Sequence, residues 1–262
     1  MLDGKVAIIT GASRGIGAAS ARAFAEAGAV VVLAARNEAA LAAVAEEIES
    51  SGGKALAVPT DVTDPQSVAS LVELAVKTFG RLDVAFNNAG SGQMPKPLAD
   101  ISFEEFEAGL KANLYGAFLG MKYEIPAMIA GGGGAILNMS STAGLQGAPG
   151  MGPYAAGKHG VVALTKAAAL DYGKSNIRVN ALAPGPVVNE QMSRLGEDRA
   201  AADRSLHPAG PARTHRRGGP HGRLAVLRRG VVHHRRGALD RRRQAGGRGR
   251  NLNEIGRLEF AF

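Results

Sequence analysis

The chain has 262 residues and a formal net charge of +8, and 45% of its residues are hydrophobic. This length suits one large α/β domain with a sizeable core. The absence of cysteine excludes disulfides, thiolate metal sites and cysteine nucleophiles, and we expect no metal site. No apolar run reaches the roughly 18 residues that a membrane span requires. No signal peptide pattern precedes the first strand-like segment, so we expect a cytoplasmic protein with no membrane partner.

Apolar strand-like runs alternate with helical patterns along most of the chain. The predicted strands cover residues 6–10, 30–35, 55–60, 82–87, 135–140 and 177–182. The predicted helices cover residues 16–28, 38–50, 103–130 and 154–173, and a further helix starts at Asp64-Pro65. Strict β–α alternation with fully apolar strands predicts a parallel sheet with helices on both faces. The expected fold class is α/β, a single doubly wound Rossmann-like domain.

A glycine-rich turn, Thr10 to Gly17, follows the first predicted strand and opens a helix. This context is typical of a dinucleotide-binding turn, although an ordinary tight turn remains an alternative. Gly11 would permit the turn, Gly15 would let a pyrophosphate approach the backbone, and Gly17 would let the helix pack on the sheet. The free N–H groups of the helix N-terminus would bind the phosphates. The expected cofactor contacts here are Gly11, Ser13, Arg14, Gly15, Ile16 and Gly17.

The end of the second predicted strand indicates which dinucleotide is bound. NAD-binding folds usually place an acid there to bind the ribose 2′-hydroxyl. This chain has Ala35 followed by Arg36, and Arg14 lies in the glycine turn. Two guanidinium groups suit the dianionic 2′-phosphate, so we expect NADP(H) to be favoured over NAD(H). The alternative is that Arg36 only begins a solvated helix.

Tyr154 and Lys158 stand four residues apart in a predicted helix, so they share one face. A phenol with a pKa near 10 is a poor acid–base group at neutral pH. A nearby cation stabilises the phenolate and lowers that pKa, which suits the phenol for proton exchange with a carbonyl or alcohol oxygen. By spacing alone, the pair could also be a solvated helix face.

Together these motifs resemble those of the classical short-chain dehydrogenase/reductase family. The matching landmarks follow the family's order over roughly residues 1–195: the glycine turn at 10–17, Asn87-Asn88-Ala89-Gly90, Asn113, Ser140-Ser141, Tyr154 with Lys158, and Pro184-Gly185. The chain is similar in particular to 3-oxoacyl-[acyl-carrier-protein] reductase-like members. The resemblance implies an oxidoreductase that moves a hydride between NADP(H) and a small-molecule carbonyl or alcohol. It also implies a homo-oligomer.

The resemblance further implies roles for individual residues. Tyr154 would be the general acid in reduction and the base in oxidation, and Ser141 would polarise the substrate oxygen. Lys158 would hold the nicotinamide ribose and lower the pKa of Tyr154, and Asn113 would anchor a water leading to Lys158. The other implied cofactor contacts are Asp61 and Val62 beside the adenine, Asn87, Ala89 and Gly90 through their backbone, and Pro184 and Gly185 beside the nicotinamide.

Alternatives remain for several of these side chains. Ser141 could cap the loop after its strand, Asn113 could be a helix-kink amide, and Asp61 could start a turn. Where the family has a threonine that bonds the carboxamide, this chain has Asn189. Residues 91–98 and the segment after 186 would choose the substrate, and their sequences do not identify it.

The C-terminal segment departs from the family, which continues with a helix and a last strand. Residues 204–262 hold roughly 15 of the 31 basic residues and about three acids. Codons permitted for Leu224 to Gly237 allow a frame shifted by one base that encodes WLCSDAGSFITGA, which is similar to the missing family segment. We therefore infer a frameshift near Pro208–Ala209, with residues 1–205 as the catalytic domain and 206–262 as an aberrant tail.

Such a tail would leave a sheet edge exposed, and its composition is typical of disorder. We therefore expect irregular structure beyond about residue 205, with lower stability and activity than in an intact relative. Two alternatives follow from the tail. The chain could be a catalytically impaired protein that keeps the fold, or its arginine-rich tail could bind nucleic acid, a partner that we do not expect.

Overall fold

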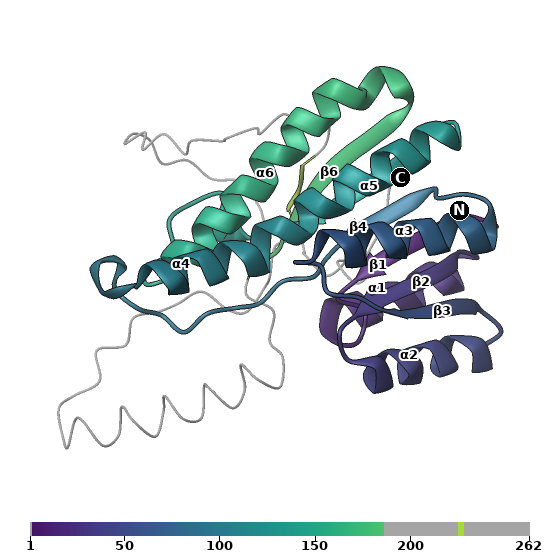
Figure 1. The fold of residues 1–262 in the computed structure, drawn as a ribbon, viewed down its shortest axis with the longest axis horizontal. Helices are drawn as coiled ribbons and strands as arrows, with labels where there is room; N and C mark the ends of the chain where they lie inside the picture. Colours follow the sequence, from purple (N-terminus) through teal and green to yellow (C-terminus); the bar gives the residue numbers. More distant parts are fainter. Residues whose placement is uncertain (1, 186–224, 228–262) are drawn as a thin grey trace, which may run out of the picture.

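The computed structural model describes residues 2–185 and 225–227, and its centre is one β-sheet (Figure 1). Six strands lie parallel in the order β3-β2-β1-β4-β5-β6. Their bounds are β1 (Val6–Thr10), β2 (Val30–Ala35), β3 (Lys54–Pro59), β4 (Val84–Asn87), β5 (Gly134–Met139) and β6 (Ile177–Ala183). This arrangement confirms the predicted α/β class and parallel sheet.

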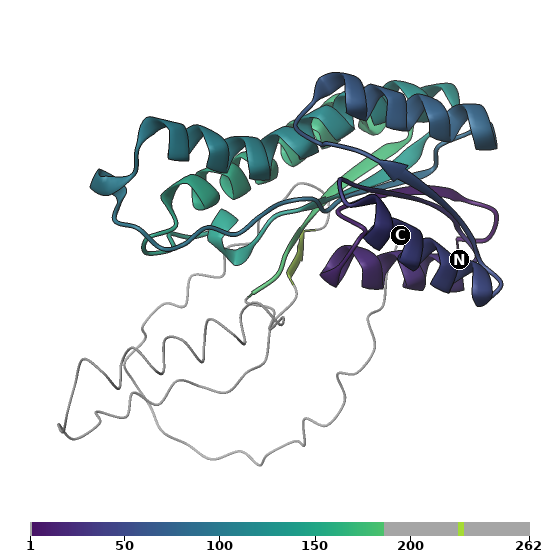
Figure 2. The same cartoon turned by 60° about the horizontal axis from the view of Figure 1, so that its bottom comes forward.

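Helices cover both faces of the sheet, as predicted. They are α1 (Gly15–Glu26), α2 (Glu38–Ser50), α3 (Pro65–Phe79), α4 (Phe103–Leu110), α5 (Gly116–Ala130) and α6 (Gly152–Tyr172). Figure 2 shows α1 and α2 on one face, with α3, α5 and α6 on the other. Short 3-10 turns cover Leu98–Asp100, Thr142–Gly144 and Gly173–Ser175. Among the residues that the structure describes, no helix combines the length and the apolar character that a membrane crossing needs.

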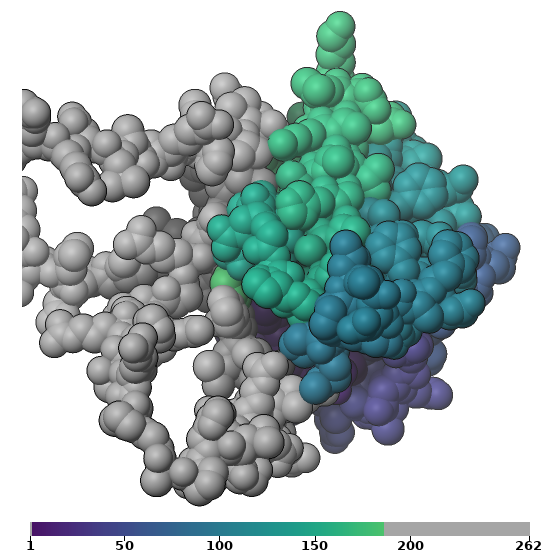
Figure 3. All heavy atoms as spheres, turned by 90° about the vertical axis from the view of Figure 1, so that its left-hand side faces the viewer, coloured from purple at the N-terminus to yellow at the C-terminus, as the bar shows by residue number. Residues whose placement is uncertain are grey.

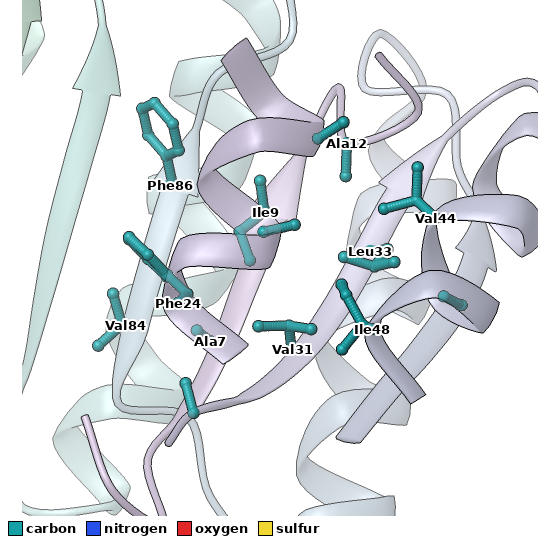
Figure 4. Packing of buried hydrophobic residues seen from close by; sticks show 14 of the residues in the cluster. Ala7, Ile9, Ala12, Phe24, Val31, Leu33, Val44, Ile48, Val84 and Phe86 are labelled. Carbon is teal, nitrogen blue, oxygen red and sulfur yellow. The ribbon is translucent and has the colours of Figure 1, made fainter. Parts of the chain in front are cut away.

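Two apolar clusters hold the helices against the sheet. In the cluster of Figure 4, Ile9, Val31 and Phe86 of the strands meet Phe24 of α1 and Ile48 of α2. The cluster on the other face includes residues of α3, α5 and α6. Full burial of one such side chain contributes about 1.5–3 kcal/mol. The strands are therefore fixed from both sides, and their carboxyl ends form a rigid edge.

The predicted helix over 103–130 is interrupted in the structure. A π-helical turn spans Lys111–Tyr115, between α4 and α5. Within it, Asn113 Nδ2 donates to the carbonyl of Gly109 at 3.1 Å. That carbonyl would accept the Asn113 N–H in a regular α-helix, so the side chain competes for the acceptor. The predicted helical bounds of 103–130 are therefore confirmed, and the π-helical turn inside them is a local departure that the sequence analysis did not predict.

Three residues of the tail form a seventh strand at the sheet edge. This strand, β7 (Ala225–Leu227), pairs antiparallel with β6. A strand edge presents unpaired N–H and C=O groups, which any extended segment can pair with. The prediction of irregular structure was therefore wrong for these three residues. The prediction of an exposed sheet edge was wrong for Ala181–Ala183 of β6, the residues with which they pair. The rest of the predicted tail, the inferred frameshift position and Asn189 lie outside the described residues.

Candidate active site

The glycine turn between β1 and α1 is shaped for close approach. A Cβ on Gly17 would lie 2.2 Å from the carbonyl oxygen of Gly11, so α1 meets the turn where only glycine fits. A Cβ on Gly15, whose φ is +56°, would meet no atom within 4 Å. Arg14 is the N-cap of α1, and its side chain makes no capping hydrogen bond. The turn therefore offers open space and a helix N-terminus without a side-chain cap, which fits a phosphate group.

The turn is tied to β4 by two residues that the sequence did not single out as site residues. Thr10 Oγ1 accepts from the N–H groups of Asn88 and Ala89 at 3.0 and 3.1 Å. Asn88 Nδ2 donates to the carbonyl of Thr10 at 2.9 Å. Asn88 lies within the Asn87-Asn88-Ala89-Gly90 motif, so this motif could have identified it as a site residue. These bonds fix the glycine turn relative to the strand end.

The predicted adenosine-side residues gather at the ends of β2 and β3. Arg36 and Arg14 are exposed. Asp61 accepts from the backbone N–H of Thr63 at 2.9 Å and from its hydroxyl at 2.8 Å. These two bonds lower the pKa of Asp61, and the positive charge of Arg36 lowers it further. The Arg36 guanidinium and the Asp61 carboxylate are therefore close enough to interact.

Tyr154 and Lys158 lie in the first turns of α6, with Lys158 turned inward. Lys158 is 3% exposed, and burial lowers the pKa of its ammonium to about 8. Lys158 Nζ donates to the carbonyl of Met139 at 2.9 Å and lies 5.7 Å from the centre of the Tyr154 ring. Tyr154 is only half-buried. A cation thus stands beside a phenol that remains open to solvent.

The two serines at the end of β5 have different environments. Ser140 is 2% exposed, and its hydroxyl donates to the carbonyl of Lys158 at 2.9 Å. Ser141 is half-buried, and its Oγ accepts from the N–H of Ala143 at 3.2 Å. Thr142 N donates to the carbonyl of Pro184 at 3.0 Å, which brings the end of β6 to this loop. Ser141 therefore has the more accessible hydroxyl, and it also caps its loop.

Asn113 reaches the same place from the π-helical turn. Its Oδ1 accepts from the N–H of Ser91 at 3.2 Å. A Cβ on Gly90 would lie 3.0 Å from Asn113 Oδ1 and 3.1 Å from Lys158 Nζ. Gly90 therefore lies against both polar groups, and a side chain there would crowd them.

Asn87 has a different place from its neighbours in the motif. It is 3% exposed, and its amide donates to Glu124 Oε2 and to Asn138 Oδ1, each at 3.0 Å. Glu124 is 1% exposed, and burial raises its pKa to about 7. The Asn87 side chain therefore points into the protein and leaves only its backbone for a cofactor. The sequence analysis did not identify Glu124.

The predicted residues thus form two groups along the carboxyl edge of the sheet. The first surrounds the start of α1 and the ends of β2 and β3, with Gly11, Ser13, Arg14, Gly15, Ile16, Gly17, Arg36, Asp61 and Val62. The second surrounds the start of α6 and the ends of β4 to β6, with Ala89, Gly90, Asn113, Ser141, Tyr154, Lys158, Pro184 and Gly185. Such an edge is where open α/β sheets bind nucleotides.

The fold and this edge together define a nucleotide-binding α/β protein, and comparison with known proteins specifies the family. The model of the short chain dehydrogenase family matches residues 5–200. The 2,5-dichloro-2,5-cyclohexadiene-1,4-diol dehydrogenase of Sphingobium indicum is 43% identical over 213 residues, which are 80% of this chain and 84% of that protein. The cyclohexanol dehydrogenase of an Acinetobacter species is 41% identical over 208 residues, covering 79% and 82%.

A solved structure gives the same result. NAD+-bound xylitol dehydrogenase superposes with a TM-score of 0.73 at 37% identity, covering 76% of this chain and 77% of that one. The chain belongs to the short chain dehydrogenase family. It is therefore an NAD(P)-binding oxidoreductase that acts on alcohol or carbonyl groups.

Proposed function

We propose that the protein is an NADP(H)-dependent oxidoreductase in which Tyr154 exchanges the proton with the substrate oxygen. The observation that carries this proposal is the buried Lys158 ammonium, 5.7 Å from the ring of a half-buried Tyr154. A cation at this place stabilises the negative charge that the Tyr154 oxygen carries once it has given up its proton. The nicotinamide, when bound, supplies or accepts the hydride.

The chain's own residues then have separate tasks. In the oxidation of an alcohol, Tyr154 Oη takes the hydroxyl proton, and in reduction it returns that proton to the carbonyl oxygen. Ser141 Oγ donates a hydrogen bond to the same oxygen, where negative charge develops. Asn113 and Gly90 line the approach to Lys158 Nζ. Mutation of Tyr154 to phenylalanine should reduce kcat by at least 100-fold while cofactor affinity changes little, because only the proton-transfer group is lost.

The preference for NADP(H) rests on Arg36 and Arg14 at the adenosine side. Xylitol dehydrogenase carries NAD+ in its structure, so family membership alone does not choose the cofactor. Arg36 directly follows Ala35, the last residue of β2, where an acid would select NAD. Its guanidinium is exposed and can bind a 2′-phosphate.

Titration with NADPH and NADH, followed by nicotinamide fluorescence, tests this preference. Wild-type protein should bind NADPH more tightly, and R36A should lose about tenfold or more of the NADPH affinity while NADH affinity stays within about twofold. R178A is the control. Arg178 is an exposed arginine near the amino end of β6, far from the carboxyl ends of the strands where the cofactor is expected to bind. Equal effects of R36A on both cofactors would refute the 2′-phosphate assignment.

For the substrate we propose a secondary alcohol on a six-membered carbocycle, or the matching ketone. The support is that two relatives, at 43% and 41% identity, are named for a cyclohexadienediol and for cyclohexanol. The assay compares cyclohexanol, an acyclic secondary alcohol of equal carbon number and, in the reducing direction, a 3-oxoacyl thioester. A kcat/KM that is highest for the thioester would favour the reductase subtype instead.

We also propose that residues 1–205 form the catalytic domain and that residues 206–262 arise from a shifted frame. The support is that the family match ends at residue 200 and that the basic composition begins just after it. Sequencing the coding DNA tests the frame directly. The encoded chain and a frame-restored version should then be compared for activity and for oligomeric state, since we also propose a homo-oligomer. An encoded chain that binds cofactor without turnover, beside an active restored chain, would establish the catalytically impaired alternative.

A further inference from the structure

We propose that Gln93 is a positioning residue that fixes Tyr154 by capping the helix that carries it. This inference rests on the proposed role of Tyr154 as the proton-transfer group. Gln93 lies in the loop between β4 and α4, 61 residues before Tyr154. It acts on the reaction through the backbone of Tyr154 and not through contact with the reacting atoms.

The start of α6 lacks a local cap. Its N-cap residue is Met151, whose side chain makes no capping hydrogen bond. The first backbone bond of the helix runs from Ala155 N to the carbonyl of Met151 at 2.7 Å, so the N–H of Tyr154 precedes the helical ladder. Such first-turn donors need an acceptor from elsewhere. Gln93 Oε1 is that acceptor, at 2.8 Å from Tyr154 N.

The other end of the Gln93 amide is also held. Gln93 Nε2 donates to the carbonyl of Gly150 at 3.1 Å, and Lys96 N donates to the same carbonyl at 3.0 Å. Gly150 has φ +72°, and a Cβ there would lie 2.9 Å from Pro95 Cβ. The loop over 93–96 and the segment over 150–154 are therefore joined by three hydrogen bonds and by a close packing contact.

Helix α4 supports the same turn from another direction. A Cβ on Gly109 would lie 2.4 Å from Pro153 Cβ, directly before Tyr154. Figure 3 shows the face on which α4 and α6 lie side by side. The Tyr154 backbone is thus held between α4 and the loop that carries Gln93.

Because Gln93 fixes the backbone of Tyr154, it sets where the hydroxyl stands relative to Ser141 and Lys158. A displacement of about 1 Å in a reacting group can cost about 100-fold in rate. The same loop presents Met94, which is 65% exposed, and leads to Leu98, which is 71% exposed. Gln93 therefore joins the loop expected to contact the substrate to the residue that moves the proton.

The test replaces Gln93 by methionine, which keeps the length of the side chain and removes both hydrogen bonds. We expect Q93M to lower kcat by about tenfold or more with unchanged cofactor affinity. The KM for the substrate should change by less than about twofold, because the loss concerns the placement of the proton-transfer group and not substrate binding. Q66M is the matched control, since Gln66 is an exposed residue of α3, and it should change neither quantity.

A second variant separates capping from folding. Q93E keeps an oxygen acceptor for Tyr154 N and loses the donor to Gly150, and a carboxylate is favourable at a helix N-terminus. Its kcat at the top of its own pH profile should recover to within about threefold of wild type. A Q93E as impaired as Q93M, or a Q93M that changes only the substrate KM, would overturn the inference.

Y154F shows whether a negative result concerns only the positioning role of Gln93 or also the proposed proton-transfer role of Tyr154. If Y154F is inactive and Q93M is normal, only the positioning role is wrong. If Y154F keeps wild-type kcat, the proposed function itself fails.

Discussion

Glu124 should make the stability of this protein depend on pH in the neutral range. Its carboxyl is 1% exposed in α5 and forms no ion pair with any residue that the structure describes. Its neighbour is the neutral amide of Asn87, which donates to Glu124 Oε2 at 3.0 Å. Burial disfavours the charged form and raises the pKa to about 7, above its ordinary value of 4.5. The variant to test is E124Q, whose side chain has nearly the shape of glutamate but does not titrate.

The direction in which stability changes with pH follows from proton binding. Between these two pKa values the folded state holds a proton that the unfolded state has lost, so the stability of the folded state falls as pH rises. The Glu124 contribution is fully present below about pH 4.5 and is lost as pH rises through about 7. Each pKa unit corresponds to about 1.4 kcal/mol. Between pH 5 and pH 8 the wild type should therefore lose about 2–3 kcal/mol relative to E124Q.

Urea unfolding of both proteins at several pH values from 5 to 8 measures this difference. Lys158, whose pKa burial lowers to about 8, adds stability with the opposite slope above that pH, but it is present in both proteins and its contribution cancels in the difference. A wild-type minus E124Q difference that stays constant within about 0.5 kcal/mol would refute the argument, because the carboxyl would then have the same pKa in both states.

Two further predictions concern the cofactor turn and the start of β4. G17A should abolish measurable NADPH binding, because its Cβ would lie 2.2 Å from the carbonyl oxygen of Gly11. G92A is the control: a Cβ at Gly92 would meet no atom within 4 Å, so this variant should bind NADPH like wild type in the same fluorescence titration. D83N should cost about 2 kcal/mol in urea unfolding at pH 7. Burial raises the pKa of Asp83, but hydrogen bonds from Arg81, the Val6 N–H and Lys5 outweigh the effect of burial and leave the pKa lowered. The stability deficit of D83N should therefore disappear as pH falls below about 4. A deficit that persists in acid would contradict this.

Local sequence patterns predicted the element order because strands and helices are set over short distances. For α3, Asp64 accepts from Gln66 N and Ser67 N, Pro65 follows at the first position, and Gly80 ends the helix in the left-handed conformation. Each of these signals lies within or next to the helix itself. The parallel sheet followed in the same way, since apolar strands alternate with helices.

The π-helical turn at Lys111–Tyr115 could not be predicted from that kind of pattern. The apolar periodicity continues through it, and the interruption depends on where one amide, that of Asn113, finds its acceptor. The pairing of Ala225–Leu227 with β6 is a similar case, because composition alone favoured irregular structure throughout the tail. In both segments a specific backbone partner decided the outcome.

The sequence by itself determined the fold class, the family and the residue types of the site, because motif order and periodicity are properties of the chain. Only the tertiary structure decided which groups meet across it. It placed Gln93 against Tyr154, Asn88 against the glycine turn and Glu124 beside Asn87. The physical reason is that hydrogen-bond partners and pKa values depend on burial and on neighbours that are tens of residues away in the chain.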